Sequence, residues 1–102
     1  TNKKPKATVT LSKNGKTKTI ETKGDGMVDA VCSAIRQIAE IDADLIEYNV
    51  GAVTEGLDSL AHVVVHLESD GIRAIGRANS TDVVEASAKA YLDAVNQVLA
   101  RK

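Results

Sequence analysis

Aromatic residues are scarce in this 102-residue chain, which contains two tyrosines but neither phenylalanine nor tryptophan. The hydrophobic fraction is still 43%, so valine, isoleucine, leucine and alanine must fill the core. A chain of this length has room for one domain with a modest core. Small aliphatic side chains favour thin layers, and we therefore expect helices packed on sheets.

Cysteine and long apolar runs are also scarce. Cys32 is the only cysteine, which excludes an intramolecular disulfide and gives no sign of an oxidising compartment. No apolar run approaches the ~20 residues that a membrane-spanning helix needs. The chain begins at Thr1 in a polar, lysine-rich run, so we expect a cytoplasmic piece of a longer protein that has no membrane partner.

Positive charge is concentrated at one end of the chain. The net charge is −1, yet the first 23 residues contain seven lysines against Glu21 alone. A basic arm is typical of nucleic-acid binding. This one has neither aromatic residues nor arginine, and its lysines alternate with threonines as on the solvent-facing side of an edge strand. We therefore expect no nucleic-acid partner, and a small RNA-binding or protein-interaction module is kept as an alternative.

Alternation of apolar and polar residues with period two predicts strands. We expect them at residues 7–11, 16–22, 45–53, 61–67 and 72–78. Asn14-Gly15 and Asp70-Gly71 predict hairpin turns, and 54–60 is expected to be a loop. One face of the strand at 45–53 should carry Ile46, Tyr48, Val50 and Ala52. On this face of small aliphatic residues, Tyr48 belongs either to the core or to the wall of a pocket.

Two stretches have the spacing of amphipathic helices. The first is expected to begin at about Met27 and to end at Asp42-Ala43-Asp44, with an apolar stripe of Val28, Val31, Cys32, Ile35 and Ile38. The second is expected to run from Asp82 to about Leu99, with a stripe of Val84, Ala88, Tyr91, Val95 and Val98. Asp82 and Glu85 resemble a capping box at its start.

The two halves of the chain resemble each other at a constant offset of 56 residues. Val9, Leu11 and Gly15 recur as Val65, Leu67 and Gly71. Both hairpin turns and both helix starts share this register without a gap. We therefore predict an α+β fold of two strand-rich units related by a pseudo-twofold axis, each an antiparallel sheet with one helix packed on it.

The loop Gly24-Asp25-Gly26 precedes the first predicted helix. Glycines let the backbone turn sharply and leave amide N–H groups unshielded. A helix that begins at Met27 directs its free N–H groups and the positive end of its dipole toward this loop, which makes a seat for a carboxylate or a phosphate. The alternative is a plain loop-to-helix junction. A dinucleotide motif is not indicated, because Asp29 stands where its third glycine would be.

Other polar groupings predict neither catalysis nor a metal site. His62, His66 and Glu68 share one strand face, but a zinc site needs three or four converging ligands and no second Cys/His group supports them. Asp58, Ser59 and His62 lack the strand–turn–helix context of a nucleophile elbow. We interpret both groupings as solvated surface.

Three motifs stand in order along the chain: Gly24-Asp25-Gly26-x-Val28-Asp29-Ala30, Leu45-x-x-Tyr48-x-Val50-x-Ala52-Val53-Thr54-x-Gly56-x-Asp58, and Thr81-Asp82-Val83-Val84-Glu85-Ala86-Ser87-Ala88-Lys89-Ala90-Tyr91. The first resembles the G-[ND]-G-P-[VI]-D-A motif of the C-terminal regulatory domain of 2-isopropylmalate synthase and of its relative citramalate synthase. The other two are similar to motifs of the same domain. Together the resemblance covers nearly all of residues 7–100.

We expect residues 1–6 to be a disordered lead-in, and the resemblance implies an amino-acid-binding regulatory domain at 7–102. Such a domain dimerises, binds the end product leucine and inhibits a TIM-barrel condensing domain of the same polypeptide. The chain itself is then not an enzyme and has no cofactor of its own, since the divalent metal and acetyl-CoA belong to the acyltransferase barrel. Isoleucine as effector, with a citramalate synthase parent, is the alternative.

The resemblance also implies where the ligand binds. The implied contacts are Gly24, Asp25, Gly26, Val28, Asp29, Leu45, Tyr48, Ala52, Ser59, Leu60, Ala61 and Asn79. The loop backbone would meet the charged ends of the ligand, and the apolar residues would wall its side chain. Met27 replaces the usual proline, Ala61-His62 stands where a glycine and a polar residue are common, and 76–79 replaces a glycine-richer segment. These departures concern ligand orientation and selectivity more than the fold.

Overall fold

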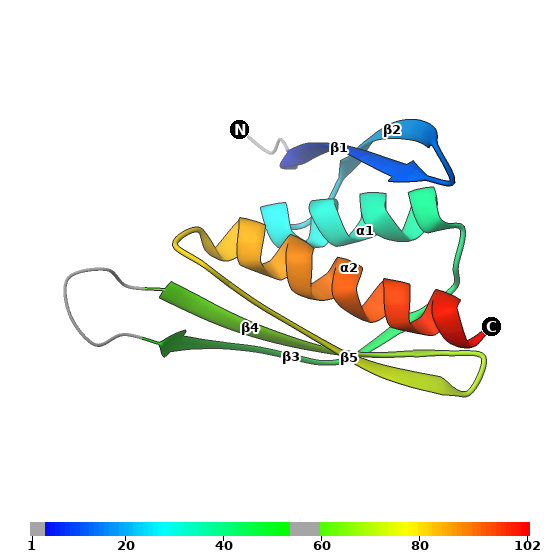
Figure 1. Cartoon of the computed structure of the whole chain (residues 1–102). Helices are drawn as coiled ribbons and strands as arrows, with labels where there is room; N and C mark the ends of the chain where they lie inside the picture. The colour runs from blue at the N-terminus through cyan, green and yellow to red at the C-terminus, as the bar shows by residue number, and fades with distance from the viewer. Residues whose placement is uncertain (1–3, 54–59) are drawn as a thin grey trace. The chain divides into compact units, whose positions relative to one another are not determined.

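The computed structural model describes residues 4–53 and 60–102, which fall into two compact units, Thr1–Ile41 and Asp42–Lys102 (Figure 1). The first unit contains β1 (Lys6–Lys13), β2 (Lys16–Lys23) and α1 (Met27–Ala39). The second contains β3 (Asp44–Val53), β4 (Leu60–Ser69), β5 (Ile72–Ser80) and α2 (Val83–Arg101). The predicted α+β class is confirmed, with one antiparallel sheet and one helix in each unit.

The first unit is a β-hairpin with a helix packed on it. β1 and β2 pair antiparallel around a two-residue turn, in which Asn14 and Gly15 both have positive φ, 53° and 77°. That conformation matches the twist of the strands and favours Asn-Gly. α1 packs through its alanine face, and the buried Thr22 hydroxyl donates to the carbonyl of Ala30 at 2.5 Å. This contact fixes the first turn of the helix against β2.

The second unit is a three-stranded sheet in the order β3-β4-β5, with α2 across one face (Figure 1). α2 packs on β4 and β5, and the core between them holds Val63, Val65, Leu67, Tyr91, Val95 and Val98. Gly76 lets the helix approach β5 closely: a Cβ there would collide with the Ala90 carbonyl and lie 2.6 Å from the Ala94 amide nitrogen. The position therefore excludes any larger residue.

The predicted end of the first helix is wrong by several residues. α1 ends at Ala39, because Glu40 adopts the left-handed conformation with φ 58°. The N–H groups of Glu40 and Ile41 bond back to the carbonyls of Gln37 and Arg36, at 3.2 and 3.3 Å. These bonds satisfy carbonyls of the last turn and stop the helix before the predicted Asp42-Ala43-Asp44.

The predicted face of the third strand is wrong at one residue. The register between β3 and β4 shifts between Leu45 and Glu47, so Ile46 is the extra residue of a β-bulge. Ile46 lines a small cavity together with His66 and Ile75, on the face of the sheet away from α2. Tyr48 instead pairs with a buried residue of β4 and faces the helix.

Each helix buries part of its predicted stripe, Ile35 and Ile38 on α1 and Tyr91, Val95 and Val98 on α2, together with alanines outside the stripe. On α1, Val28, Val31 and Cys32 are only half-buried, while Ala30 and Ala34 are fully buried. On α2, the predicted Val84 and Ala88 are half-buried; the buried residues are Ala86, Ser87, Ala90, Tyr91, Ala94, Val95 and Val98. The small side chains of Ala90 and Ala94 lie where the backbone of α2 approaches Gly76 of β5.

The offset of 56 residues is repeated in the local structure. β2 begins at Lys16 and β5 at Ile72, and α1 begins at Met27 and α2 at Val83. The turn residues Asp70 and Gly71 have φ of 51° and 78°, within two degrees of their counterparts in the first hairpin. The pseudo-twofold relation of the units stays a prediction. Within residues 4–53 and 60–102, no helix is both long enough and apolar enough to span a membrane.

Candidate functional site

The glycine loop before α1 is held tightly by its first glycine. Gly24 is buried, and its N–H donates to the carbonyl of Pro5 at 3.1 Å. A Cβ on Gly24 would lie 2.5 Å from the amide nitrogen of Ala30 and 2.6 Å from a carboxylate oxygen of Asp29. The requirement for glycine here therefore comes from the packing of the loop on the first turn of α1.

Two carboxylates stand beside this loop. The N–H of Asp25 donates to Oδ2 of Asp29 at 3.0 Å, so the side chain of Asp29 folds back over the loop. The carboxylate of Asp25 lies 3.5 Å from the amino group of Lys4 and is largely exposed. The loop thus presents negative charge at its surface and uses two of its N–H groups within the chain, those of Gly24 and Asp25.

The start of α1 has no side-chain cap among the described residues. Gly26 is the N-cap residue, with extended φ and ψ of −148° and 172°, and the first intrahelical bond runs from the Ala30 N–H to its carbonyl at 3.0 Å. The N–H groups of the first turn precede that bond and have no acceptor within the helix. They point outward at the positive end of the helix dipole, where an anion is stabilised.

The start of α2, at the equivalent position, has a side-chain N-cap. Asp82 accepts a hydrogen bond from the Val84 N–H at 2.8 Å through its side chain. The predicted capping box is only partly correct, because Glu85 accepts from the hydroxyl of Ser80 at 3.1 Å and that hydroxyl accepts from the Asp82 N–H at 3.2 Å. Hydrogen bonds from Lys89 and then Ser80 hold the pKa of Glu85 below its ordinary value. The two helix starts therefore differ in chemistry.

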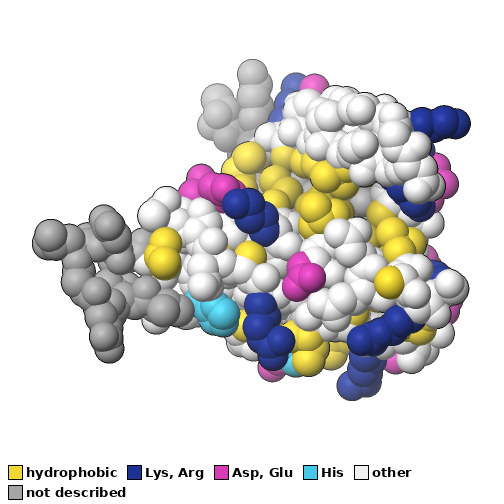
Figure 2. All heavy atoms as spheres, viewed as in Figure 1, with side chains coloured by type: hydrophobic (Ala, Val, Ile, Leu, Met, Phe, Trp, Pro, Cys, Tyr) yellow, Lys and Arg dark blue, Asp and Glu magenta, His cyan; other side chains and the backbone are white. Residues whose placement is uncertain are grey.

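In the second unit, the helix-facing side of β3 carries a half-exposed apolar strip. Leu45 and Val50 are 50% and 48% exposed, and Ala52 is exposed beside them. α2 covers β4 and β5, which leaves this margin of the sheet open. Figure 2 shows one face of the molecule, on which several apolar side chains reach the surface.

Tyr48 is anchored at this margin by its hydroxyl group. Tyr48 Oη and Ser87 Oγ are 2.7 Å apart, and Ser87 Oγ donates to the carbonyl of Val83 at 2.7 Å. Because the serine hydroxyl has one proton, the tyrosine is the donor in the first bond. Tyr48 is half-buried, whereas Ser87 is completely buried. The ring is thus held in a fixed orientation at the edge of the core.

The remaining predicted contact residues of the second unit lie on both faces of its sheet. Ala61 pairs with Ala52 and lies on the helix-facing side, as does Tyr48. Leu60 and Asn79 lie on the opposite face, because side chains alternate along a strand. Asn79 accepts a hydrogen bond from Nδ1 of His62, its cross-strand partner. The last predicted contact in this region, Ser59, lies outside the described residues.

A cysteine thiol and a histidine ring also have defined surroundings among the described residues. Burial raises the pKa of the half-buried Cys32 thiol to about 11, which leaves it protonated and unreactive at neutral pH. Nε2 of His66 lies 3.4 Å from the carboxylate of Glu47 on an open strand face. Within residues 4–53 and 60–102, His, Cys, Asp and Glu side chains form no group of three or more that could hold a metal ion.

Sequence reasoning missed Ser87 as a partner of Tyr48. The signal available was a serine inside the apolar run of the third motif, one turn after Val83. Such a serine can bond to the carbonyl four residues earlier, as it does here. Its second bond, to a residue 39 positions away, required the fold.

Comparison with known sequences decides the family. The profile described as LeuA allosteric (dimerisation) domain matches residues 1–99. The chain belongs to this family. The family is described as allosteric, which agrees with the regulatory domain that the three motifs resemble.

Relatives of this LeuA allosteric domain are named 2-isopropylmalate synthase. The chain is 53% identical over 96 residues to one from Caulobacter sp. (strain K31), covering 94% of this chain and 18% of the relative. It is 46% identical over 98 residues to one from Parasynechococcus marenigrum (strain WH8102), covering 95% and 18%. Identity to the Aquifex aeolicus (strain VF5) protein is 40% over 98 residues, covering 96% and 19%. The chain spans less than a fifth of the length of these relatives.

Proposed function

We propose that this chain is the regulatory domain of a 2-isopropylmalate synthase and that it binds leucine as a feedback inhibitor. Family membership and the names of the relatives support the parent enzyme. The observation that carries the ligand assignment is the contrast between the two helix starts: α2 is closed by Asp82, whereas α1 begins at an uncapped glycine beside two carboxylates.

The start of α1 suits the charged end of a free amino acid. A ligand carboxylate would accept hydrogen bonds from the first-turn N–H groups, beginning at Met27, and would gain from the helix dipole. The ammonium group, one carbon away, would meet the carboxylates of Asp25 and Asp29. Both charges of the zwitterion therefore have a complementary partner within a few residues. Val28, half-buried in the first turn, offers the ligand side chain an apolar contact.

In the second unit, the residues proposed to contact a branched aliphatic side chain are Leu45, Tyr48 and Ala52, with Ala61 opposite. Their shared face is apolar and half-exposed, and the bond to Ser87 keeps the tyrosine ring in place. A fixed, small apolar wall can distinguish aliphatic side chains that differ by one methyl group, at about 1–3 kcal/mol. Leu60 and Asn79 lie on the other face of the sheet, and their proposed contacts therefore need a separate test.

The proposal extends to partners outside the chain. We propose that the domain forms a homodimer and that it inhibits a TIM-barrel catalytic domain of the same polypeptide. The divalent metal and acetyl-CoA would be held by that barrel. A ligand shifts such an enzyme between states only by as much as it prefers one state over the other.

Thermal unfolding of the chain with single amino acids tests the ligand assignment. A ligand that binds only the folded state adds about 2.7 kcal/mol at 100 times its Kd, which for a domain of this size raises Tm by roughly 10 °C or more. We expect the largest rise with leucine, a smaller one with isoleucine or valine, and almost none with alanine. A rise that is largest with isoleucine would favour a citramalate synthase parent.

Leucinamide provides the matched control, since it keeps the side chain and the ammonium group but lacks the carboxylate. We expect it to give no shift, because the helix start would then face a neutral amide. Equal shifts with leucine and leucinamide would remove the carboxylate seat from the proposal. Absence of any shift with all four amino acids, in a folded chain, would contradict leucine binding by this domain.

A further inference from the structure

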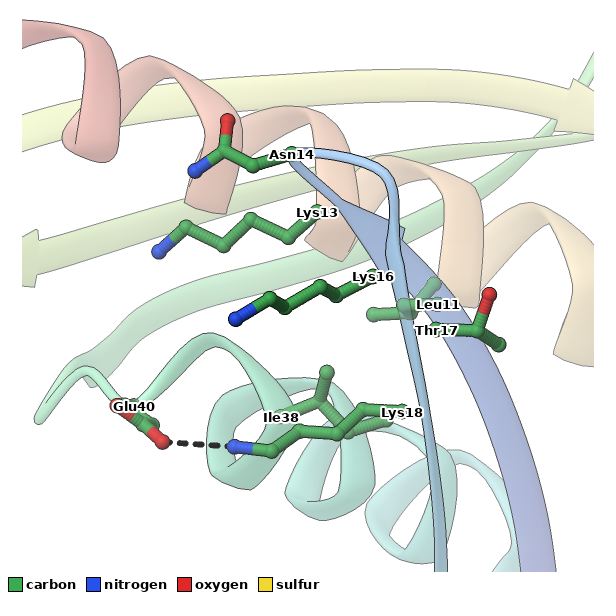
Figure 3. A pocket seen from close by; sticks show the side chains of 8 residues that line it. All are labelled: Leu11, Lys13, Asn14, Lys16, Thr17, Lys18, Ile38 and Glu40. Atoms are coloured by element: carbon green, nitrogen blue, oxygen red, sulfur yellow. Dashed lines mark hydrogen bonds and ion pairs between the residues drawn. The ribbon is translucent and has the colours of Figure 1, made fainter.

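A cavity of about 450 Å³ lies in the first unit between the tip of the β1–β2 hairpin and the C-terminal end of α1. Leu11 and Ile38 form its apolar floor, and Lys13, Lys16, Lys18 and Glu40 surround it (Figure 3). The glycine loop is at the opposite end of α1, thirteen residues and thus about 20 Å away. The cavity is therefore distinct from the proposed leucine site.

The cavity exists because α1 is short. α1 has thirteen residues and α2 nineteen, although both begin at equivalent positions. The last turns of α2 cover the tip of the second hairpin: Arg101 donates to the carbonyl of Arg73 at 2.5 Å, and Lys102 lies 3.0 Å from Asp70. At Glu40 the first helix turns away instead, and the corresponding part of its hairpin remains open.

The residues near the tip of the first hairpin are also more exposed than their counterparts in the second hairpin. Ser69, Ile72 and Ala74 stand 56 positions after the three lysines of the cavity. Ser69 and Ala74 are buried and Ile72 is half-buried, whereas all three lysines are exposed. The first unit thus has ammonium groups where the second has a covered, largely apolar surface.

The lysines give the cavity a surplus of positive charge. Lys13 and Lys16 are direct cross-strand partners, an arrangement of like charges that destabilises a hairpin. In Figure 3 their amino groups and that of Lys18 extend to the same side of the hairpin. Lys18 pairs with Glu40 at 2.7 Å. Three positive charges and one negative charge leave a site that would be neutralised by a dianion.

We propose that this cavity binds a small dianion that carries a short aliphatic group, either a substituted dicarboxylate or an alkyl phosphate. Its charged oxygens lie between Lys13 and Lys16, and its aliphatic group rests on Leu11 and Ile38. The volume is within the range of small-molecule sites. Binding also relieves the repulsion between the two cross-strand lysines.

Amide NMR spectra of the full chain, titrated at low ionic strength, test this site. The probes are isopropylmalonate and isobutyl phosphate, and the control is isovalerate, which has the same aliphatic group but one charge. We expect saturable shifts in residues 11–18 and 38–40 with one or both dianions, at millimolar concentrations, and none in 24–29. Comparison of the two dianions distinguishes a dicarboxylate from a phosphate ligand.

Variants that each remove one lysine charge distinguish binding at a specific site from general electrostatic attraction. Lys13→Gln and Lys16→Gln should each weaken binding roughly two- to fivefold, as expected for an exposed ion pair. Lys23→Gln, at the far end of β2, removes the same charge and should leave the affinity unchanged. Both cavity variants remove a like-charge contact, so they should keep or raise Tm. Equal weakening by all three variants, unsaturable shifts, or equal binding of isovalerate would overturn the proposal.

Discussion

Replacing Gly26 with aspartate would give α1 the same kind of N-cap as α2. The backbone already has the extended conformation that suits any residue, and a Cβ at Gly26 would meet nothing within 4 Å. Asp82 shows what the new side chain would do, since its carboxylate accepts from an N–H of the first turn at 2.8 Å. In Gly26→Asp, an internal carboxylate would occupy the seat proposed for the carboxylate of leucine.

The expected effects on stability and binding have opposite signs. A better N-cap adds a few tenths of a kcal/mol, and loss of the glycine's freedom in the unfolded chain adds about 0.4–1 kcal/mol. Repulsion from Asp25 and Asp29 reduces this gain. Leucine, in contrast, would lose at least one hydrogen bond to a charged group, about 1.5–3 kcal/mol. We therefore expect unchanged or slightly higher stability and a Kd for leucine that rises tenfold or more.

Urea unfolding and calorimetric titration with leucine measure the two effects separately. Gly26→Asn is the matched control, because asparagine caps as well as aspartate without adding charge; it should weaken leucine binding less. Asp82→Asn should leave the Kd unchanged. If Gly26→Asp binds leucine as tightly as the parent chain while remaining folded, the start of α1 does not seat the carboxylate.

Three further changes test the packing and the charges. Gly76→Ala should destabilise by about 1–3 kcal/mol or more, measured by urea unfolding, because the new Cβ collides with α2. Tyr48→Phe should cost about 0.5–1.5 kcal/mol, and a double-mutant cycle with Ser87→Ala should assign that energy to their hydrogen bond. The hydrogen bond and charge of Lys18 hold the pKa of Glu40 below its ordinary value, so the pair stabilises the fold at pH values above the pKa of glutamate in the unfolded chain, and this contribution is lost as pH falls through the folded pKa. Lys18→Gln should therefore reduce the acid sensitivity of unfolding.

Each of these changes has a control and an outcome that contradicts it. Gly51→Ala has open space around the new Cβ and should be neutral or slightly stabilising; equal losses at Gly51 and Gly76 would refute the close approach of α2. A cycle with no coupling would mean that Tyr48 is held by packing alone. High salt should abolish the effect of Lys18→Gln, since the pair is exposed.

Features fixed by a few adjacent residues could be predicted from the sequence. Asn14-Gly15 and Asp70-Gly71 specify their turns because few other residues adopt positive φ easily. The start of α2 was predictable from the capping chemistry of Asp82. The glycine loop was recognised for the same reason, as a local pattern next to a helix start.

Features set by non-local packing or by a rare local conformation could not be predicted. Glu40 ends α1 in the left-handed conformation, which usually selects glycine, so the residue type at this position did not indicate the end of the helix. The bulge that displaces Ile46 depends on the register with β4. The partners of Tyr48 and of Asn79 come from other elements of the second unit. Sequence reasoning therefore identified the loop before α1 from local pattern, whereas the face of the sheet on which Leu60 and Asn79 lie required the strand register.

The two units share one plan and differ at both ends of the helix. In the second, Asp82 closes the start of α2, and six further residues cover the end of its hairpin. In the first, both devices are missing, and a non-glycine residue in the left-handed conformation adds about 1 kcal/mol of strain. The second unit shows that this arrangement of strands and helix can include both stabilising features. A need for stability alone therefore does not explain why the first unit differs. Among the described residues, its two ends present first-turn N–H groups without a side-chain cap at one place and excess ammonium groups at the other, and both kinds of group can bind anions. Under the two proposals above, the first unit would bind the charged groups of its ligands, and the second unit would supply the apolar contacts proposed for β3 and β4.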